Sequence, residues 1–319
     1  MKGYLGVDVG SVSTNLVVID DQNQLLAAQY LRTSGKPIET VQKGLSAIGE
    51  DLPADVEIAG AATTGSARYL TSLIVGADVV KNEITAHAIA SSALVEDVKT
   101  IIEIGGQDSK IIILREGVVT DFAMNTVCAA GTGSFLDQQA SRLLISIEDF
   151  GNYALKAKNP VRIAGRCAVF AESDMVHKQQ LGHNTEDIIA GLCEALVRNY
   201  MNNVGKGKEI LAPVMFQGGV AANAGLVQAF NKYLGLEVVV PQHYGVMGSI
   251  GAAILAREAS RKKGSTSFKG FNIQEINFKT RSFECKGCSN ACEVVQFFEN
   301  NELLARWGDR CGKWELQAM

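Results

Sequence analysis

A pattern of strand, acidic residue, glycine turn and strand occurs twice in this chain. The acidic residues are Asp8 and Glu103, and a third strand-like stretch follows in both copies. Because each strand leads into another strand and not into a helix, both copies are predicted to be β-meanders. The repetition indicates an internal structural duplication with one sheet in each half. The predicted strands are residues 4–9, 16–19 and 25–31 in the first copy and 101–104, 110–114 and 118–122 in the second.

Periodic apolar positions between and after the two copies predict helices. In residues 38–48, for example, Val41 and Leu45 fall on one helical face. Two short apolar runs later in the chain, 215–216 and 238–240, predict further strands. The predicted helices are residues 38–48, 83–94, 133–144, 168–181, 185–203 and 248–259.

Together these elements predict an α/β protein with two similar domains. Residues 1–98 form the first domain and residues 99–247 the second, and a closing helix at 248–260 packs back on the first. The polar stretch 261–267 is typical of a linker, and a small cysteine-rich module, 268–319, follows it. A length of 319 residues fits two domains with an appendage.

Charge and hydropathy argue against two classes of function. The formal net charge is −4, which does not suit a nucleic-acid binder that works by neutralising phosphates. No stretch supplies the roughly 20 apolar residues of a membrane span, and the start of the chain lacks a signal-peptide layout. We therefore expect a cytoplasmic protein with no membrane or nucleic-acid partner. Thiols stay reduced in the cytoplasm, so the seven cysteines indicate metal or redox chemistry.

Three glycine turns follow predicted strands, at residues 8–14 (DVGSVST), 103–108 (EIGGQD) and 217–223 (QGGVAAN). One such turn is common in hairpins, but three in this order point to a nucleotide. Backbone amides in turns bind phosphate groups, and a glycine backbone leaves room for a purine. The carboxylates beside the first two turns can hold hydrated Mg²⁺. Neither the dinucleotide-binding glycine fingerprint nor the P-loop pattern occurs.

Two cysteines lie where helices are predicted to begin. Cys128 precedes a glycine turn that opens a helix, and Cys167 stands at another helix start. A helix N-terminus stabilises a thiolate, and thiolates are the usual ligands of iron–sulfur clusters, four to a cubane. Two thiols per chain become four in a symmetric dimer. The alternative is that both are buried core residues, which is what we expect of Cys193 in the apolar pattern of 185–203.

Several stretches resemble one family, the ATP-dependent activators of 2-hydroxyacyl-CoA dehydratases. They are NTVCAAGTGSFLD (125–137), RCAVFAESDM (166–175), EIGGQDSK (103–110), and ATTGSAR (62–68) followed by NEITAHA (82–88). The same family includes the ATPase parts of benzoyl-CoA reductases and the reductases of double-cubane-cluster proteins. It falls in the superfamily of actin, Hsp70 and sugar kinases. The resemblance, which covers roughly residues 3–258, implies two RNase H-like (actin-like ATPase) domains with ATP between them.

The resemblance also implies roles for the glycine turns. Asp8, Glu103 and Gln107 become the catalytic residues, and Mg²⁺ accompanies the ATP. The superfamily often has Asp where this chain has Glu103, so whether Glu103 contacts Mg²⁺ or the attacking water stays open. The implied ATP-binding residues are Gly10, Ser11, Val12, Ser13, Thr14, Gly105, Gly106, Gly218, Gly219 and Asn223.

For the two cysteines the resemblance implies a homodimer. One [4Fe–4S] cluster at the two-fold axis is ligated by Cys128 and Cys167 of each subunit. ATP binding and hydrolysis change the angle between the helices that begin at these cysteines. The reduced cluster then passes one electron at low potential to an iron–sulfur dehydratase or reductase, with ferredoxin or flavodoxin as the upstream donor. The rival hypotheses are a small-molecule kinase of the same superfamily, which needs no cluster, and a binding or filament protein with an actin-like core.

The C-terminal module holds the other four cysteines, around a predicted hairpin at 294–298 and 303–307. A module this small has little core and gains stability from a metal. Structural Zn²⁺ with four thiolates fits the pattern, and a second [4Fe–4S] cluster or no metal at all are the alternatives. Such an extension favours the branch of the family that serves double-cubane-cluster or related reductases. The candidate ligands are Cys285, Cys288, Cys292 and Cys311.

Overall fold

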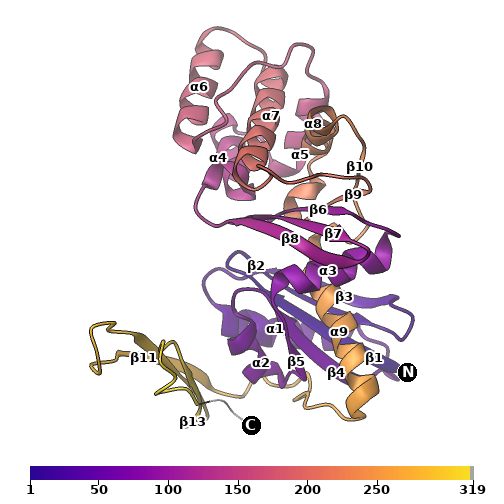
Figure 1. The fold of residues 1–319 in the computed structure, drawn as a ribbon, viewed down its shortest axis with the longest axis vertical. Coiled ribbons are helices and arrows are strands. Elements are labelled where there is room, and N and C mark those ends of the chain that lie inside the picture. The colour runs from indigo at the N-terminus through magenta and orange to yellow at the C-terminus, as the bar shows by residue number, and fades with distance from the viewer. Residues whose placement is uncertain (317–319) are drawn as a thin grey trace. The chain divides into compact units, whose positions relative to one another are not determined.

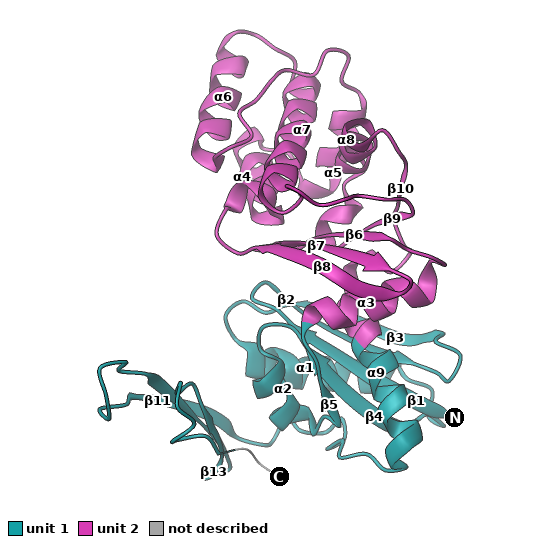
Figure 2. Cartoon of the chain, in the orientation of Figure 1, with its two compact units in different colours: residues 1–82, 252–319 teal, residues 83–251 magenta. Residues whose placement is uncertain are grey.

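The computed structural model describes residues 1–316. The chain forms two compact units (Figure 2). Unit 1 comprises residues 1–82 and the chain from 252 onward, and unit 2 comprises residues 83–251. The units place residues 83–98 with the second sheet, whereas the sequence-based division placed them in the first domain. The domain assignment itself stays a prediction.

Unit 1 is built on a five-stranded sheet, counted over the described residues, in the order β3-β2-β1-β4-β5 (Figure 1). The first three strands form the predicted antiparallel meander, and β4 and β5 run parallel to β1. Sequence analysis missed β4, because the middle of the strand consists of Ala and Gly, which are depleted in strands. The strands are β1 (Lys2–Val9), β2 (Ser13–Ile19), β3 (Leu25–Arg32), β4 (Glu57–Thr64) and β5 (Val79–Val80).

Three helices of the described chain pack on this sheet. They are α1 (Pro37–Asp51), α2 (Arg68–Val75) and the long α9 (Met247–Lys263), which begins in unit 2. Pro37 suits the first turn of α1 because that turn leaves its N–H groups unpaired. A Cβ at Gly60 would lie 2.8 Å from the Ala256 carbonyl oxygen, so β4 and α9 approach closely. Because α9 extends to Lys263, the first three residues of the predicted linker are helical.

Unit 2 repeats the topology of unit 1. Among the described residues its sheet also has five strands, in the order β10-β9-β6-β7-β8. A three-stranded meander again stands beside two strands that run parallel to its first strand. The predicted duplication is therefore confirmed. The strands are β6 (Thr100–Ile104), β7 (Ser109–Arg115), β8 (Val118–Asn125), β9 (Val214–Gln217) and β10 (Val238–Val239).

Most helices of unit 2 gather around α7, whose residues are largely buried in the main core, whereas the helix at Glu83–Leu94 packs on β7 and β8. Four helices of the unit confirm predicted ones: α3 (Glu83–Leu94), α4 (Gly133–Leu143), α6 (Ala168–Gln180) and α7 (Thr185–Asn203). Sequence analysis missed α5 (Ile147–Leu155) and α8 (Ala224–Leu234), although side-chain caps mark both starts. Ser146 Oγ accepts from the Asp149 N–H, and Asn223 Oδ1 accepts from the Leu226 N–H. Short 3₁₀ turns lie at Ala129–Gly131 (η1), Gly219–Ala222 (η2) and Tyr244–Val246 (η3).

After α9, the chain runs along unit 1 before it forms the C-terminal sheet. Gln42 Nε2 donates to the carbonyl oxygens of Ile273 and Ile276, at 2.8 and 3.0 Å. Ile273 is buried in the same hydrophobic cluster as Leu45. The described part of the module then forms an antiparallel sheet of β11 (Phe278–Glu284), β12 (Glu293–Glu299) and β13 (Glu302–Trp307). The predicted hairpin is thus confirmed, and the last three residues of the module lie outside the described ones.

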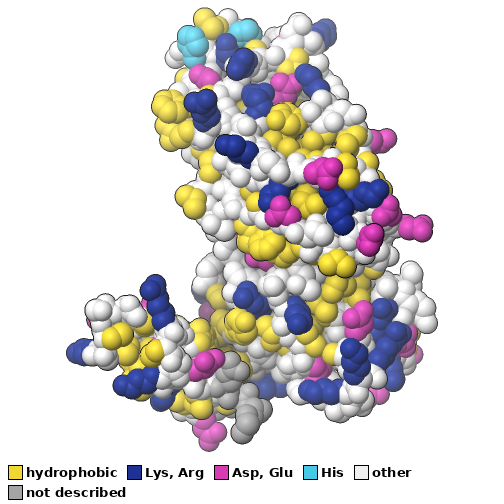
Figure 3. All heavy atoms as spheres, in the orientation of Figure 1, with side chains coloured by type: hydrophobic (Ala, Val, Ile, Leu, Met, Phe, Trp, Pro, Cys, Tyr) yellow, Lys and Arg dark blue, Asp and Glu magenta, His cyan; other side chains and the backbone are white. Residues whose placement is uncertain are grey.

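Two surface properties bear on partners. No helix within residues 1–316 is long and apolar enough to cross a membrane. On the face that Figure 3 shows, Lys and Arg side chains are interspersed with Asp and Glu. This mixture agrees with the small net charge.

Candidate functional site

The first glycine turn joins β1 to β2 in unit 1. The Gly10 N–H donates to the Ser13 carbonyl oxygen at 2.9 Å, which closes the turn. Asp8 lies at the end of β1 against Gly65, where a Cβ would stand 2.5 Å from Asp8 Oδ1. Gly65 also has φ +89°, a conformation that other residues rarely adopt. Glycine at position 65 therefore leaves the room that the Asp8 carboxylate occupies.

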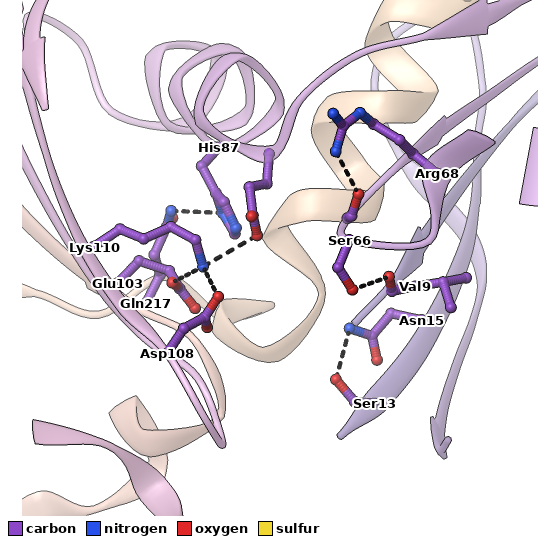
Figure 4. Close-up of polar contacts among 12 residues, drawn as sticks. Val9, Ser13, Asn15, Ser66, Arg68, His87, Glu103, Asp108, Lys110 and Gln217 are labelled. Carbon is purple, nitrogen blue, oxygen red and sulfur yellow. Dashed lines mark hydrogen bonds and ion pairs between the residues drawn. The ribbon is translucent and has the colours of Figure 1, made fainter. Parts of the chain in front are cut away.

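Residues around this turn hold it in shape. Ser66 Oγ donates to the Val9 carbonyl oxygen at 3.3 Å (Figure 4). Thr14 is fully buried, and its hydroxyl lies 3.0 Å from that of Thr33. The Thr14 side chain thus supports the turn, whereas Ser11 is exposed. Of the residues predicted to bind ATP here, Ser11 is the most exposed and Thr14 the most buried.

The second glycine turn joins β6 to β7 in unit 2, beside a buried lysine. Lys110 is 2% exposed, and its Nζ forms ion pairs with three carboxylates. It lies 2.9 Å from Glu103 Oε2, 3.0 Å from Asp108 Oδ2 and 3.1 Å from Glu83 Oε2. Figure 4 shows Glu103 and Asp108 turned toward the Lys110 ammonium group. Gln107, the third predicted catalytic residue, is exposed at the tip of the turn.

These pairs set the protonation of the group. Burial by itself lowers the pKa of Lys110, but the three carboxylates outweigh it and raise that pKa well above its usual value. Lys110 therefore stays charged. Burial raises the pKa of Glu103, and Lys110 opposes that rise. Burial and the Lys110 charge lower the pKa of His87 to about 4, so His87 is neutral near pH 7.

The third glycine turn follows β9 and touches the second. Because Gly218 has φ +90° and a Cβ there would lie 2.3 Å from the Ile104 carbonyl oxygen, only glycine fits. The preceding residue, Gln217, is fully buried. Its Nε2 lies 2.9 Å from Nδ1 of neutral His87 and donates to it. Asn223 serves as the N-cap of α8, and its Nδ2 has no partner within the described residues.

Cys128 lies just after β8, at the N-cap of η1. The thiol is half-buried. Asn125 Oδ1 accepts from the Cys128 N–H at 2.9 Å, and Asn125 Nδ2 donates to the Cys128 carbonyl oxygen at 2.8 Å. The predicted helix start is here a 3₁₀ turn, with α4 beginning at Gly133.

Cys167 is the N-cap residue of α6 and is also half-buried. Exposed apolar side chains flank both thiols. Val127 is 94% exposed, Val169 69% and Phe170 66%. Exposed apolar side chains that adjoin functional groups are typical of interfaces. Cys193, by contrast, is buried in the core as predicted.

Hydrogen bonds join the second glycine turn to the chain that carries Cys128. The Gly133 N–H donates to the Gly105 carbonyl oxygen, and the Ser134 N–H donates to that of Gly106, both at 2.9 Å. Ser134 Oγ also donates to the Gly106 carbonyl oxygen at 2.5 Å. The first N–H groups of a helix have no acceptor within the helix. At the start of α4, the carbonyl oxygens of the glycine turn accept from two of them. The second glycine turn is therefore bonded directly to the segment that follows Cys128.

The four C-terminal cysteines do not converge. Cys285 Sγ accepts from Trp314 Nε1 at 3.2 Å and from the Gly287 N–H at 3.4 Å, and the first of these bonds contributes most to lowering the Cys285 pKa. Cys288 and Cys311 are exposed, and the Cys311 thiol donates to Asp309 Oδ2. Within the described residues no group of three or more His, Cys, Asp or Glu side chains is placed to hold a metal ion. The geometry thus does not fit the predicted Zn²⁺ or second cluster, which stays a prediction.

Sequence analysis missed three residues that organise these sites: Lys110, Ser134 and Asn199. A lysine at the start of an otherwise apolar strand is the signal that could have pointed to Lys110. Nothing in the sequence distinguishes Ser134 or Asn199 from ordinary helical polar residues, because their partners come from distant segments.

Comparison with known proteins gives a consistent result. The sequence profile of the BadF/BadG/BcrA/BcrD ATPase family matches residues 5–256. The (R)-2-hydroxyglutaryl-CoA dehydratase activating ATPase of Acidaminococcus fermentans is 33% identical over 262 residues, which cover 81% of this chain and 98% of that protein. The crystal structure of component A of the dehydratase from the same organism has a TM-score of 0.76 at 31% identity, over 82% of this chain and 100% of the other.

A second solved structure is the activator of the 2-hydroxyisocaproyl-CoA dehydratase from Clostridium difficile with bound ADPNP. Its TM-score is 0.73 at 28% identity, over 82% of this chain and 97% of the other. The family match ends at residue 256, so the C-terminal sheet and its cysteines lie beyond it.

Proposed function

This chain belongs to the BadF/BadG/BcrA/BcrD ATPase family, and we propose that it is an ATP-driven electron donor. It hydrolyses ATP and couples the hydrolysis to one-electron transfer into a partner dehydratase or reductase. Activators of 2-hydroxyacyl-CoA dehydratases are among its relatives at 30% identity or more, which supports this assignment over the rival kinase. The kinase hypothesis also does not explain why two half-buried thiols are flanked by exposed apolar residues.

One observation carries the proposal: the hydrogen bonds between the second glycine turn and the start of α4. Gly105 and Gly106 accept from Gly133 and Ser134, and Cys128 lies a few residues upstream on the same segment. If the turn binds a phosphate, hydrolysis of ATP can move the turn. Because the turn is bonded directly to the start of α4, that movement also shifts the segment that carries Cys128. Nucleotide switches commonly work by such local contacts with a segment that has two arrangements.

For ATP, we assign the phosphates to the two meander turns. Asp8 holds Mg²⁺ through water, and exposed Gln107 orients the attacking water. Glu103 is bonded to Lys110, which favours a positioning role for Glu103 rather than contact with Mg²⁺. The remaining proposed contacts are Gly10, Ser11, Val12, Ser13, Gly105 and Gly106 with the phosphates, and Gly218, Gly219 and Asn223 with the nucleoside.

For the electron carrier, the chemistry of Cys128 and Cys167 fits a [4Fe–4S] cluster shared by two copies of the chain. Both thiols are half-buried and stand at N-cap positions, Cys128 before the 3₁₀ turn η1 and Cys167 before α6. The exposed apolar residues beside them supply a surface that a second copy can cover. When bound, such a cluster supplies one-electron transfer at low potential. Ferredoxin or flavodoxin is the proposed upstream donor.

The first test is metal analysis of protein purified without oxygen. We expect about four irons and four sulfides per dimer, together with ATP hydrolysis that requires Mg²⁺. Cys128→Ala and Cys167→Ala should lose the iron and keep nucleotide binding. Cys193→Ala, in the core, is the matched control and should keep the iron. An iron-free protein that phosphorylates a small metabolite would instead identify the kinase.

A further inference from the structure

Asn199 is a polar residue inside the buried face of α7. It is 2% exposed, and its helical neighbours Leu196 and Tyr200 belong to the main core of unit 2. A buried primary amide destabilises a fold unless its donors and acceptor find partners. The partners of Asn199 therefore indicate why the position is polar.

The amide of Asn199 contacts both cysteine-bearing loops. Its Nδ2 donates to the Gly165 carbonyl oxygen at 2.7 Å and lies 3.4 Å from that of Arg166, the residue before Cys167. The same Nδ2 lies 3.6 Å from Cys128 Sγ. On its other side, Asn199 Oδ1 accepts from Asn203 Nδ2 at 2.8 Å. Cys128 Sγ lies almost as near to Oδ1, at 3.7 Å, so as a thiol it can also donate to that oxygen. Asn203 thus holds the amide in one orientation between the two loops.

The loops are shaped to admit this contact. A Cβ at Gly131 would lie 2.8 Å from Asn199 Oδ1, and a Cβ at Gly165 would lie 2.9 Å from the Ala195 carbonyl oxygen. Both loops therefore approach α7 more closely than a residue with a side chain allows. α7 is the element that brings the two loops to one place, and Asn199 is its side chain that reaches both.

We propose that Asn199 is a positioning residue that fixes the geometry of Cys128 and Cys167 and donates a hydrogen bond to the Cys128 sulfur. The proposal rests on the proposed function, in which both sulfurs ligate the cluster. A thiolate sulfur accepts hydrogen bonds and donates none, so the contact becomes N–H···S when Cys128 is ligated. Such a bond stabilises the more negative, reduced form, because hydrogen bonds to the sulfurs set the potential of a cluster.

The test compares Asn199→Asp, which keeps the size and removes the donor, with Asn202→Asp, an exposed site on the same turn. In dimers purified without oxygen, we expect Asn199→Asp to shift the midpoint potential to a more negative value. A tenfold change in the one-electron equilibrium corresponds to about 59 mV. Iron release to a chelator should also be faster. Asn202→Asp carries the same added charge and should leave both quantities unchanged.

A second readout does not need the cluster. Hydrogen exchange of the metal-free protein should show faster exchange at residues 127–131 and 163–167 together in Asn199→Asp, because one side chain holds both. If Asn199→Asp does not fold, the test uses Asn203→Ala at an exposed site. That variant removes only the contact that orients the Asn199 amide. Faster exchange in both loops than in Asn202→Ala supports the proposal.

The outcomes distinguish a failure of the proposed function from a failure of the role proposed for Asn199. An iron-free wild type contradicts the proposed function, and hydrogen exchange still decides the role of Asn199. An iron-loaded wild type with an unchanged potential and unchanged exchange in Asn199→Asp overturns the positioning role alone.

Discussion

Replacement of Lys110 by Met gives the sharpest test of the buried group at the second glycine turn. The substitution removes the one cation within 3.1 Å of three carboxylates and leaves Glu103 buried without a counter-charge. Loss of one partner from a buried ion pair costs about 3–5 kcal/mol. For a unit of this size, that loss lowers Tm by roughly 10 °C.

The pH dependence separates this cause from simple loss of packing. Burial raises the pKa of Glu103, and Lys110 opposes the rise, so Lys110→Met should raise that pKa further. A carboxyl whose folded pKa exceeds its unfolded value near 4.3 binds its proton more tightly when folded. Its stabilising contribution is present at low pH and is lost as the pH rises through the folded pKa. The deficit of the variant should therefore shrink from about pH 7 to about pH 5.

The assay is thermal unfolding followed by circular dichroism at several pH values. The control is Lys232→Met, which removes an exposed partner of Glu194 and should change stability by about 1 kcal/mol or less. A Lys110→Met protein as stable as the control at pH 7, or one whose deficit is the same at every pH, refutes the electrostatic account of this group.

Three further predictions concern separate parts of the molecule. Asp8→Ala should abolish Mg²⁺-dependent ATP hydrolysis and leave the iron content intact; unchanged turnover removes Asp8 from the site. Ser134→Ala should keep both ATP binding and iron. The rate of iron release to a chelator should differ less between the ATP and ADP states than in the wild type. An undiminished difference argues against a link from the nucleotide to Cys128 through Gly106. Because the C-terminal thiols do not converge, Cys311→Ser should leave the zinc and iron contents of the purified protein unchanged. Loss of metal from that variant would support the predicted C-terminal metal site.

The sequence was sufficient where a structural signal is local. The two meanders were predictable because apolar runs alternate with glycine turns, and α7 because acidic residues in its first turn precede a long apolar stretch. The strand β4 was missed because its small residues are buried by the close approach of α9 at Gly60, a tertiary effect. β5, with two residues, is too short for a periodic signal, whereas β10, equally short, was predicted from the apolar run 238–240.

The residues of the candidate site also differ in how far the sequence alone could predict them. The glycine turns and the two cysteines were recognisable as motifs because their chemistry requires particular residue types in sequence. The partners of Lys110 and Asn199 were not predictable, since Glu83 and Gly165 reach them only through the fold. The C-terminal cysteines show the opposite case. Their spacing suggested a metal, but the structure engages two of the thiols with Trp314 and Asp309.

The central claim is that ATP hydrolysis drives electron transfer from a cluster held by Cys128 and Cys167. The most direct test reduces the oxygen-free protein and follows its reoxidation by a one-electron dye of low potential, with Mg²⁺ and ATP, ADP or no nucleotide. The account predicts fast reoxidation only with ATP, consumption of ATP in proportion to the electrons transferred, and no such reaction in Cys128→Ala. Reoxidation at one rate in all three conditions, or ATP consumption without electron transfer, would contradict the account.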